Sequence, residues 1–184
     1  MDTTGNGSVN TSDVWLANGT NVQVTATPGS YYAFDGWQGQ TSGCAIVSNK
    51  ITAVMTTARG VGAIFIAEVT TNAVPKWWLA QHNLTNFNAD AMADADLDGL
   101  KTWQEYIAGS DPTNQGSCFR ITKCDRNIIG WDAVSGRVYS VYLATNLLSG
   151  FQPLATNIPW TCGGFTNPAP VSCGYYRIDV QLSP

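Results

Sequence analysis

The chain has 184 residues, of which 44% are hydrophobic and only 12% are charged, and its formal net charge is −4. The charged share is about half of that in an average globular protein. No cluster of Lys and Arg occurs, which argues against nucleic acid and anionic membranes as partners. No apolar run approaches the length of a membrane span, so membrane insertion is not expected. The length allows one large domain or two to three small ones.

Residues 5–68 have the pattern of short β-strands. Polar and apolar residues alternate over Val22–Ala26, the segment Tyr31–Trp37 is aromatic, and Val61–Ile66 is a continuous apolar run of the kind found in buried strands. Asn-Gly and Pro-Gly pairs mark turns between them. We therefore predict a first β module over residues 1–69.

Residues 70–115 are predicted to be helices and loops. Pro75 is expected to be the first residue of one helix, and a second helix is expected to start inside an acidic loop and end at Gly109. The stretch from Asp94 to Glu105 fits the pattern D-x-[DN]-x-[DN]-G-x₅-E at every specified position.

This spacing has a physical reason. Asp94, Asp96 and Asp98 alternate along a tight turn, so their carboxylates converge on one point, and Gly99 lets the turn close. Two carboxylates about 6 Å apart repel by roughly 3 kcal/mol at an effective dielectric near 20, and a hard cation removes this cost. Calcium suits the number of oxygen ligands better than magnesium. The alternative is an acidic, solvated turn without a metal.

We therefore predict Ca²⁺ as the cofactor. Its expected ligands are oxygen atoms of Asp94, Asp96, Asp98, Leu100 (through the main-chain carbonyl) and Glu105. Thr102 is a further candidate, through its hydroxyl or a bound water. Asn88, Asp90 and Asp111 are candidates for a second or extended site.

Residues 116–184 return to a β pattern. Strands are expected at residues 119–122, 128–131, 138–143 and 175–180, and Ser-Gly pairs mark turns between them.

Three segments resemble known families. The order Gly7-Ser8-Val9, Gly19–Pro28, Phe34-Asp35-Gly36-Trp37 and Ala63-Ile64-Phe65 resembles the divergent InlB-type B-repeat, a small β-grasp-like module of bacterial surface proteins. The pattern Val74-Pro75-x-Trp77-Trp78, Asp94–Leu100 and Glu105-Tyr106-x-x-Gly109-x-Asp111-Pro112 resembles thrombospondin type 3-like, dockerin-like calcium segments, which commonly link β modules. Only one such loop is complete, so cohesin binding is not expected.

The last part also resembles a known kind of module. Trp131, Gly136–Val141, Thr145–Leu147 and Tyr175–Ile178 resemble carboxyl-terminal β-sandwich modules that often follow such calcium segments. Together the resemblances imply a mainly β chain of three parts. They are a β-grasp-like module (1–69), a short helical calcium-binding segment (70–115) and a β-sandwich (116–184).

The five cysteines do not form a C-x₂-C pair, and His82 is the sole histidine, which argues against zinc. In an exported chain disulfides are more common. Cys162 and Cys173 bracket a Gly- and Pro-rich loop and are the preferred pair. A Cys118–Cys124 bond and cross pairings stay open, and the odd thiol is left free or bonds between molecules.

The sequence predicts a protein without catalytic activity, because no histidine is placed to activate a nucleophile and no phosphate-binding loop occurs. We expect an extracellular or cell-surface spacer, adhesion stalk or filament element. No signal segment is recognised in this sequence, so we expect that it was removed or that the sequence is a piece of something longer. The expected partners are other copies or adjoining modules of a larger surface protein, and calcium is expected to fix the pose of the two β modules. The alternative is a carbohydrate-binding accessory module of a secreted hydrolase. Its candidate glycan contacts are Tyr31, Tyr32, Trp37, Tyr175 and Tyr176.

Overall fold

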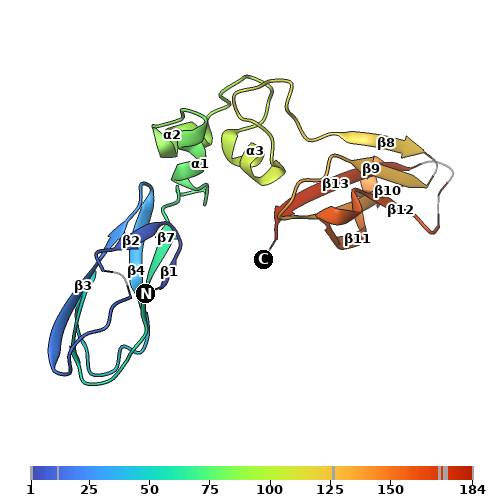
Figure 1. Cartoon of the computed structure of the whole chain (residues 1–184). Coiled ribbons are helices and arrows are strands. Elements are labelled where there is room, and N and C mark those ends of the chain that lie inside the picture. The colour runs from blue at the N-terminus through green and yellow to red at the C-terminus, as the bar shows by residue number, and fades with distance from the viewer. Residues whose placement is uncertain (1, 12, 126, 170, 172–173, 184) are drawn as a thin grey trace. The chain divides into compact units, whose positions relative to one another are not determined.

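The computed structural model describes residues 2–11, 13–125, 127–169, 171 and 174–183. Most of the regular elements are strands, so the prediction of a mainly β chain is confirmed. The chain divides into two compact units, Met1–Asn88 and Ala89–Pro184, and the boundary falls inside helix α2 (Figure 1).

Two sheets build the N-terminal unit. In the first, the central strand β7 (Val61–Ala67) pairs in parallel with β1 (Asp2–Thr4) and antiparallel with β4 (Tyr32–Gly39). The second is antiparallel, in the order β2 (Gly7–Val9), β3 (Thr20–Pro28), β6 (Lys50–Met55) and β5 (Ala45–Val47). The three predicted strands of this module correspond to β3, β4 and β7.

The core of this unit follows from the alternation in its strands. Val24 and Ala26 are the buried residues of β3, while the apolar run of β7 buries Ala63 and Phe65. Trp37 packs against the clusters around both strands. Burial of these side chains, at about 25 cal/mol for each Å² of apolar surface, is the main stabilising contribution.

Three short helices follow. α1 (Lys76–Gln81) begins one residue after the predicted start, because Pro75 has an extended ψ of 131° and precedes the helix as its N-cap. α2 (Phe87–Met92) was not predicted. α3 (Thr102–Ala108) begins at the end of the acidic loop and stops at Gly109, whose φ of 82° lies in the left-handed region, as predicted.

Two antiparallel sheets of three strands build the C-terminal unit. One has the order β11 (Gln152–Pro159), β10 (Arg137–Ala144), β13 (Tyr175–Leu182), and the other β12 (Gly164–Thr166), β9 (Ile128–Trp131), β8 (Ile121–Asp125). The 3₁₀ turns η1 (Leu147–Ser149) and η2 (Trp160–Cys162) flank β11. The core combines Ile129 and Trp131 of one sheet with Tyr139 and Val141 of the other, which is the arrangement of a β-sandwich.

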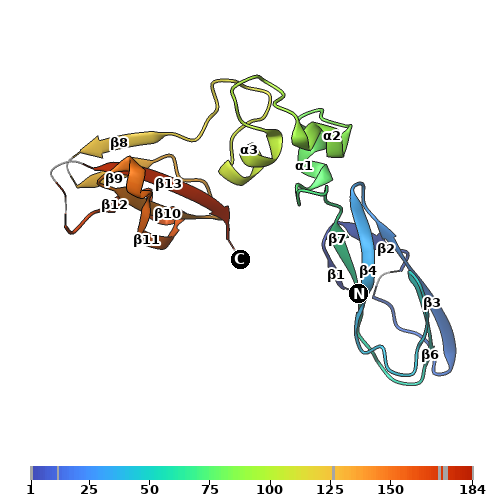
Figure 2. The same cartoon turned by 180° about the vertical axis from the view of Figure 1, so that it is seen from behind.

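Strand β8 lies at the outer edge of its sheet (Figure 2). All five of its residues are exposed, and its pairing with β9 shifts in register between Ile121 and Lys123. The strand begins two residues later than predicted. Phe119 instead stacks its ring on Tyr139, with ring centroids 5.9 Å apart, so its side chain serves the core rather than the strand.

Candidate metal centre

The acidic loop has the convergent geometry that its sequence predicts. One carboxylate oxygen from each of Asp94, Asp96 and Asp98 lies within 4.8 Å of the others. Two left-handed residues turn the backbone between them, Leu97 with a φ of 65° and Gly99 with a φ of 98°. Among the described residues, this is the only group of three or more His, Cys, Asp or Glu side chains close enough to hold a metal.

Main-chain N–H groups hold the aspartates in place. Asp94 Oδ1 accepts from the N–H of Leu97 at 2.8 Å and Asp98 at 3.2 Å, and its Oδ2 accepts from Gly99 at 3.0 Å. Asp98 Oδ1 accepts from the Leu100 N–H at 2.7 Å, and Asp96 Oδ1 accepts from the Asp98 N–H at 3.1 Å. The second oxygens of Asp96 and Asp98 are buried without any hydrogen-bond donor.

Glu105 contributes a fourth carboxylate, from the first turn of α3. Its side chain is fully buried, its Oε1 accepts a 3.3 Å hydrogen bond from the Ser110 hydroxyl, and its Oε2 has no donor. Burial first, and then the charges of Asp96 and Asp98, raise the pKa of Glu105 from 4.5 to about 7, although the hydrogen bond from Ser110 lowers it. Glu105 lies outside the group of three that converge within 4.8 Å, but its electrostatic interaction with them indicates that it faces the same loop.

The residues present fit a hard cation. Three buried carboxylate oxygens, on Asp96, Asp98 and Glu105, lack donors, and leaving such groups unsatisfied is costly. All the side-chain atoms that could coordinate the ion are oxygens, which Ca²⁺ prefers as ligands and Zn²⁺ does not. Leu100 follows Asp98 and Gly99 in the chain, and its carbonyl stays a predicted ligand.

The remaining candidate ligands have other partners. The Thr102 hydroxyl donates to the Ala93 carbonyl at 3.2 Å. Asn88 Oδ1 accepts from the Thr71 N–H at 3.1 Å, and Asp111 Oδ1 accepts from both the N–H and the hydroxyl of Thr113. Asp90 lies in the first turn of α2. Neither Asp90 nor Asp111 belongs to the convergent group, and a second site stays a prediction.

Several residues that support the loop were not predicted. Gln104 Oε1 accepts from the Lys101 N–H at 2.9 Å at the start of α3, and Gln115 Nε2 donates to the Leu97 carbonyl at 3.0 Å. Arg137 donates to two carbonyls of α3. Gln115 and Arg137 lie 18 and 30 residues from these partners, Leu97 and Ile107, and so give no local sequence signal.

Four of the five cysteines are described, and no disulfide joins any two of them: Cys44, Cys118, Cys124 and Cys162. The Cys118–Cys124 bond is therefore not formed. Five residues lie between the two cysteines, most of them in strand β8; extended chain of this length spans up to roughly 20 Å, whereas a disulfide requires Cα atoms less than about 7 Å apart. Cys173 lies outside the described residues, so its pairing with Cys162 stays a prediction.

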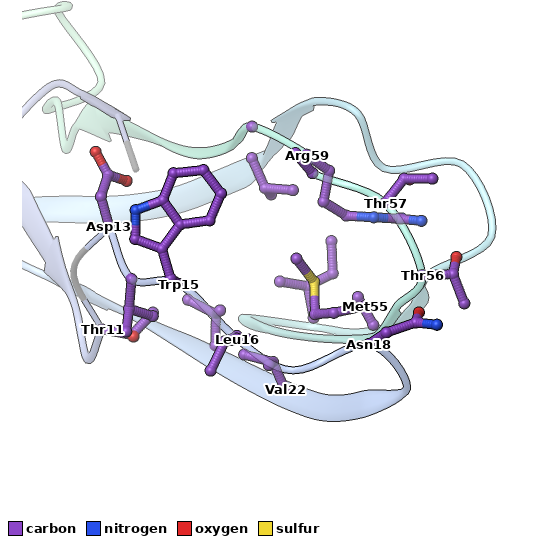
Figure 3. A pocket seen from close by; sticks show the side chains of 17 residues that line it. Thr11, Asp13, Trp15, Leu16, Asn18, Val22, Met55, Thr56, Thr57 and Arg59 are labelled. Atoms are coloured by element: carbon purple, nitrogen blue, oxygen red, sulfur yellow. The ribbon is translucent and has the colours of Figure 1, made fainter.

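A second concave feature lies in the N-terminal unit. A groove of about 540 Å³ runs between the loop around Trp15 and the segment from Met55 to Arg59. Figure 3 shows Asp13 and Trp15 on one side of it and Arg59 on the other. Trp15 is 97% exposed, which was not predicted. The Arg59 guanidinium donates to the Ser42 carbonyl at 3.0 Å and to Cys44 Sγ at 2.9 Å.

The aromatic candidates for glycan binding mostly serve as packing groups. Trp37 and Tyr32 contact the core of the N-terminal unit, and Tyr176 contacts that of the C-terminal unit. Tyr31 packs its ring edge-to-face against Phe87, and Tyr175 is 46% exposed. His82 packs against Trp78, with ring centroids 4.7 Å apart.

Comparison with known proteins identifies the first module. The family model for the divergent InlB B-repeat domain matches residues 1–69, so this part of the resemblance is confirmed, and it is a module of the kind found in bacterial surface proteins. No curated protein and no solved structure matches the chain. The resemblances of the calcium segment and the C-terminal module stay predictions. Within the described residues, every helix is too short or too polar to cross a membrane.

Proposed function

We propose that this chain is a non-catalytic, calcium-stabilised structural part of an extracellular surface protein. The observation that carries the proposal is the set of buried carboxylate oxygens without donors on Asp96, Asp98 and Glu105, next to the converged Asp94. A divalent ion at this point would neutralise charges that otherwise repel each other, and it would supply the partner that each oxygen lacks.

The residues would divide the work of holding the ion. Asp94 is already fixed by three main-chain donors and shapes the loop. Asp96 and Asp98 each use one oxygen for a main-chain donor and keep the other for the ion. Glu105 would bring its carboxylate from α3, so that calcium joins the loop to the helix. Because the ion would bind only the folded chain, its binding free energy would add to the free energy of unfolding.

The arrangement of the chain supports a structural rather than a catalytic role. The acidic loop and α3 belong to the C-terminal unit, so calcium would stabilise that unit directly. The N-terminal unit contributes a B-repeat module, and such modules are typical of surface proteins. We propose adjoining modules of the same protein, or further copies of it, as the partners. A spacer or stalk needs no chemistry beyond a stable fold.

Calorimetric titration of the apo protein with Ca²⁺ tests the proposal. The expected result is one site of stoichiometry near one, a weaker response to Mg²⁺, and a thermal unfolding temperature that rises with Ca²⁺ and falls with EGTA. The paired substitutions Asp96→Asn and Asp98→Asn should abolish the heat of binding. Asp125→Asn, an exposed carboxylate on β8 outside the loop, is the matched control. A wild-type protein that does not bind Ca²⁺ would disprove the proposal.

Trp15 favours one other function, the binding of a carbohydrate. A tryptophan ring that is 97% exposed beside a groove can stack on the apolar face of a sugar, and Asp13 and Asn18 in the wall of the groove offer hydrogen-bonding groups. A glycan array tests this function. Binding that is lost in Trp15→Ala and kept in Trp160→Ala, a matched exposed tryptophan in the other unit, would support it.

A further inference from the structure

We propose that Arg137 is a positioning residue that couples the acidic loop to the C-terminal β-sandwich, so that calcium binding and the stability of the sandwich depend on each other. The proposal rests on the calcium site proposed above. It assigns a role to a residue that has no part in binding the ion itself.

Arg137 holds the carboxyl end of α3. Its Nη2 donates to the Tyr106 carbonyl at 2.6 Å, and its Nε donates to the Ile107 carbonyl at 2.9 Å. The last carbonyls of a helix have no partner within the helix, and a cation is favourable at this end. The guanidinium also lies 5.8 Å from the centre of the Tyr106 ring. A planar, permanently charged fork suits two such acceptors, and a lysine cannot reproduce this geometry.

The same guanidinium is fixed to the sandwich. Arg137 is the first residue of β10, the central strand of its sheet, and pairs with Leu182 of β13. Its Nη1 donates to the Ser135 carbonyl at 3.1 Å, in the turn that precedes β10. Because one end of the side chain belongs to the sheet and the other binds α3, a displacement of the helix would break at least two hydrogen bonds.

A second contact reinforces this connection. Gly109, which caps α3, packs so closely on Val134 that a Cβ at this position would lie 2.7 Å from Val134 Cγ1. The Val134 N–H in turn donates to the hydroxyl of Tyr139 at 2.8 Å, and Tyr139 is fully buried in the sandwich core. The carbonyl of Glu105 accepts from the N–H of Gly109 at 2.6 Å and of Ser110 at 3.1 Å. The cap of the helix is thus held by the residue that faces the acidic loop.

α3 is therefore shared by two structures. Its first turn presents Glu105 to the aspartates, and its last turn is held by Arg137. If calcium requires the helix in this position, and the sandwich holds it there, the two must stabilise each other by the same free energy. Loss of the Arg137 contacts should weaken calcium binding by roughly tenfold, within the usual range of such couplings.

The experiment measures calcium affinity and amide hydrogen exchange of the full chain in the wild type, Arg137→Lys, Arg137→Met and Arg177→Met. Arg177 is the matched control. It lies on β13, contacts the rings of Tyr142 and Phe151, and forms an ion pair with Asp179 at 3.0 Å, but no described contact joins it to α3. In the wild type, Ca²⁺ should slow amide exchange in β10 as well as in the loop. Both Arg137 variants should bind Ca²⁺ more weakly and lose the calcium-dependent protection of β10, whereas Arg177→Met should keep both.

The outcomes separate the two proposals. A purely structural role of Arg137 would lower protection equally with and without Ca²⁺ and leave the affinity unchanged, and this result would overturn the coupling while the calcium site stands. Arg137→Lys keeps the charge and provides the comparison if Arg137→Met does not fold; wild-type affinity and protection in Arg137→Lys would then also overturn it. If the wild type binds no Ca²⁺, the proposed function fails first and the coupling with it.

Discussion

The substitution Glu105→Gln replaces the fully buried carboxylate of the acidic loop by a neutral group of the same shape. Without calcium, Glu105 Oε2 has no donor and faces the charges of Asp96 and Asp98. The amide group of a glutamine can donate to the unpartnered oxygens of these aspartates. We therefore expect the variant to be more stable than the wild type in a chelator and less stable in calcium.

The pKa of Glu105 sets the size of this effect. A rise from 4.5 to about 7 corresponds to at most about 3 kcal/mol of unfavourable interaction with the ionised carboxylate. The neighbouring aspartates are partly exposed, so solvent screening reduces the expected gain to roughly 1–2 kcal/mol. For a unit of this size, that gain raises the unfolding temperature by roughly 5–10 °C. At a Ca²⁺ concentration of about 100 times the Kd, binding stabilises the wild type by about 2.7 kcal/mol. The wild type then becomes more stable than the glutamine variant.

Thermal unfolding of both proteins, followed by near-UV circular dichroism at about pH 8 where Glu105 is mostly ionised, measures the effect in EGTA and in excess Ca²⁺. Asp125→Asn controls for the loss of an acidic side chain at an exposed site. The reasoning is refuted if the glutamine variant is less stable than the wild type in EGTA, or if calcium raises the two unfolding temperatures equally.

Three further predictions concern pH, backbone conformation and core packing. In EGTA, the stability of the C-terminal unit should fall as pH rises from 4.5 to about 7, because Glu105 keeps a proton in the folded state that it loses in the unfolded state. Urea unfolding at a series of pH values checks this, and stability that rises over that range would contradict it. Gly109→Ala should lower the free energy of unfolding by about 1–2 kcal/mol more than Gly136→Ala does. Both glycines have positive φ, but of the two only Gly109 has atoms within 4 Å of the added Cβ. Equal losses of stability in urea unfolding would argue against the Val134 contact. Trp37→Ala should destabilise the N-terminal unit by about 2–4 kcal/mol, and Trp15→Ala, at 97% exposure, by less than about 0.5 kcal/mol; a comparable loss in both would show that Trp15 packs.

The acidic loop could be predicted from sequence because its geometry is local. Asp94, Asp96, Asp98 and Gly99 are close neighbours in the chain, and their spacing alone dictates the turn. The contacts around the loop are not local. Arg137 donates to the Ile107 carbonyl from 30 residues away. Neither this arginine, after a Ser-Gly turn, nor Ser110, after a helix, carries a sequence pattern that predicts its contact. Which groups are left without donors depends on burial, which only the packed chain shows.

Some strands could likewise be predicted from the sequence, and others could not. β9 and β3 have clear apolar patterns, and the sequence predicted both. β11 contains Pro153 and Pro159, which argue against a strand, yet it pairs only with β10 at the edge of its sheet, where a missing N–H costs little. β12 has three residues, too few for a period. The 97% exposure of Trp15 could not be predicted, because exposure of a loop residue leaves no trace in the pattern.

The edge strand β8 affects whether copies of this chain associate with one another at high density. An exposed, unpaired edge invites fibrous aggregation by strand addition. Here the free rim carries Lys123 at its centre, and the shift in pairing with β9 twists the ladder out of line; a positive charge and a bulge both oppose the docking of a foreign strand. Dense display of this module should therefore leave neighbouring molecules dispersed rather than fused into a continuous ribbon.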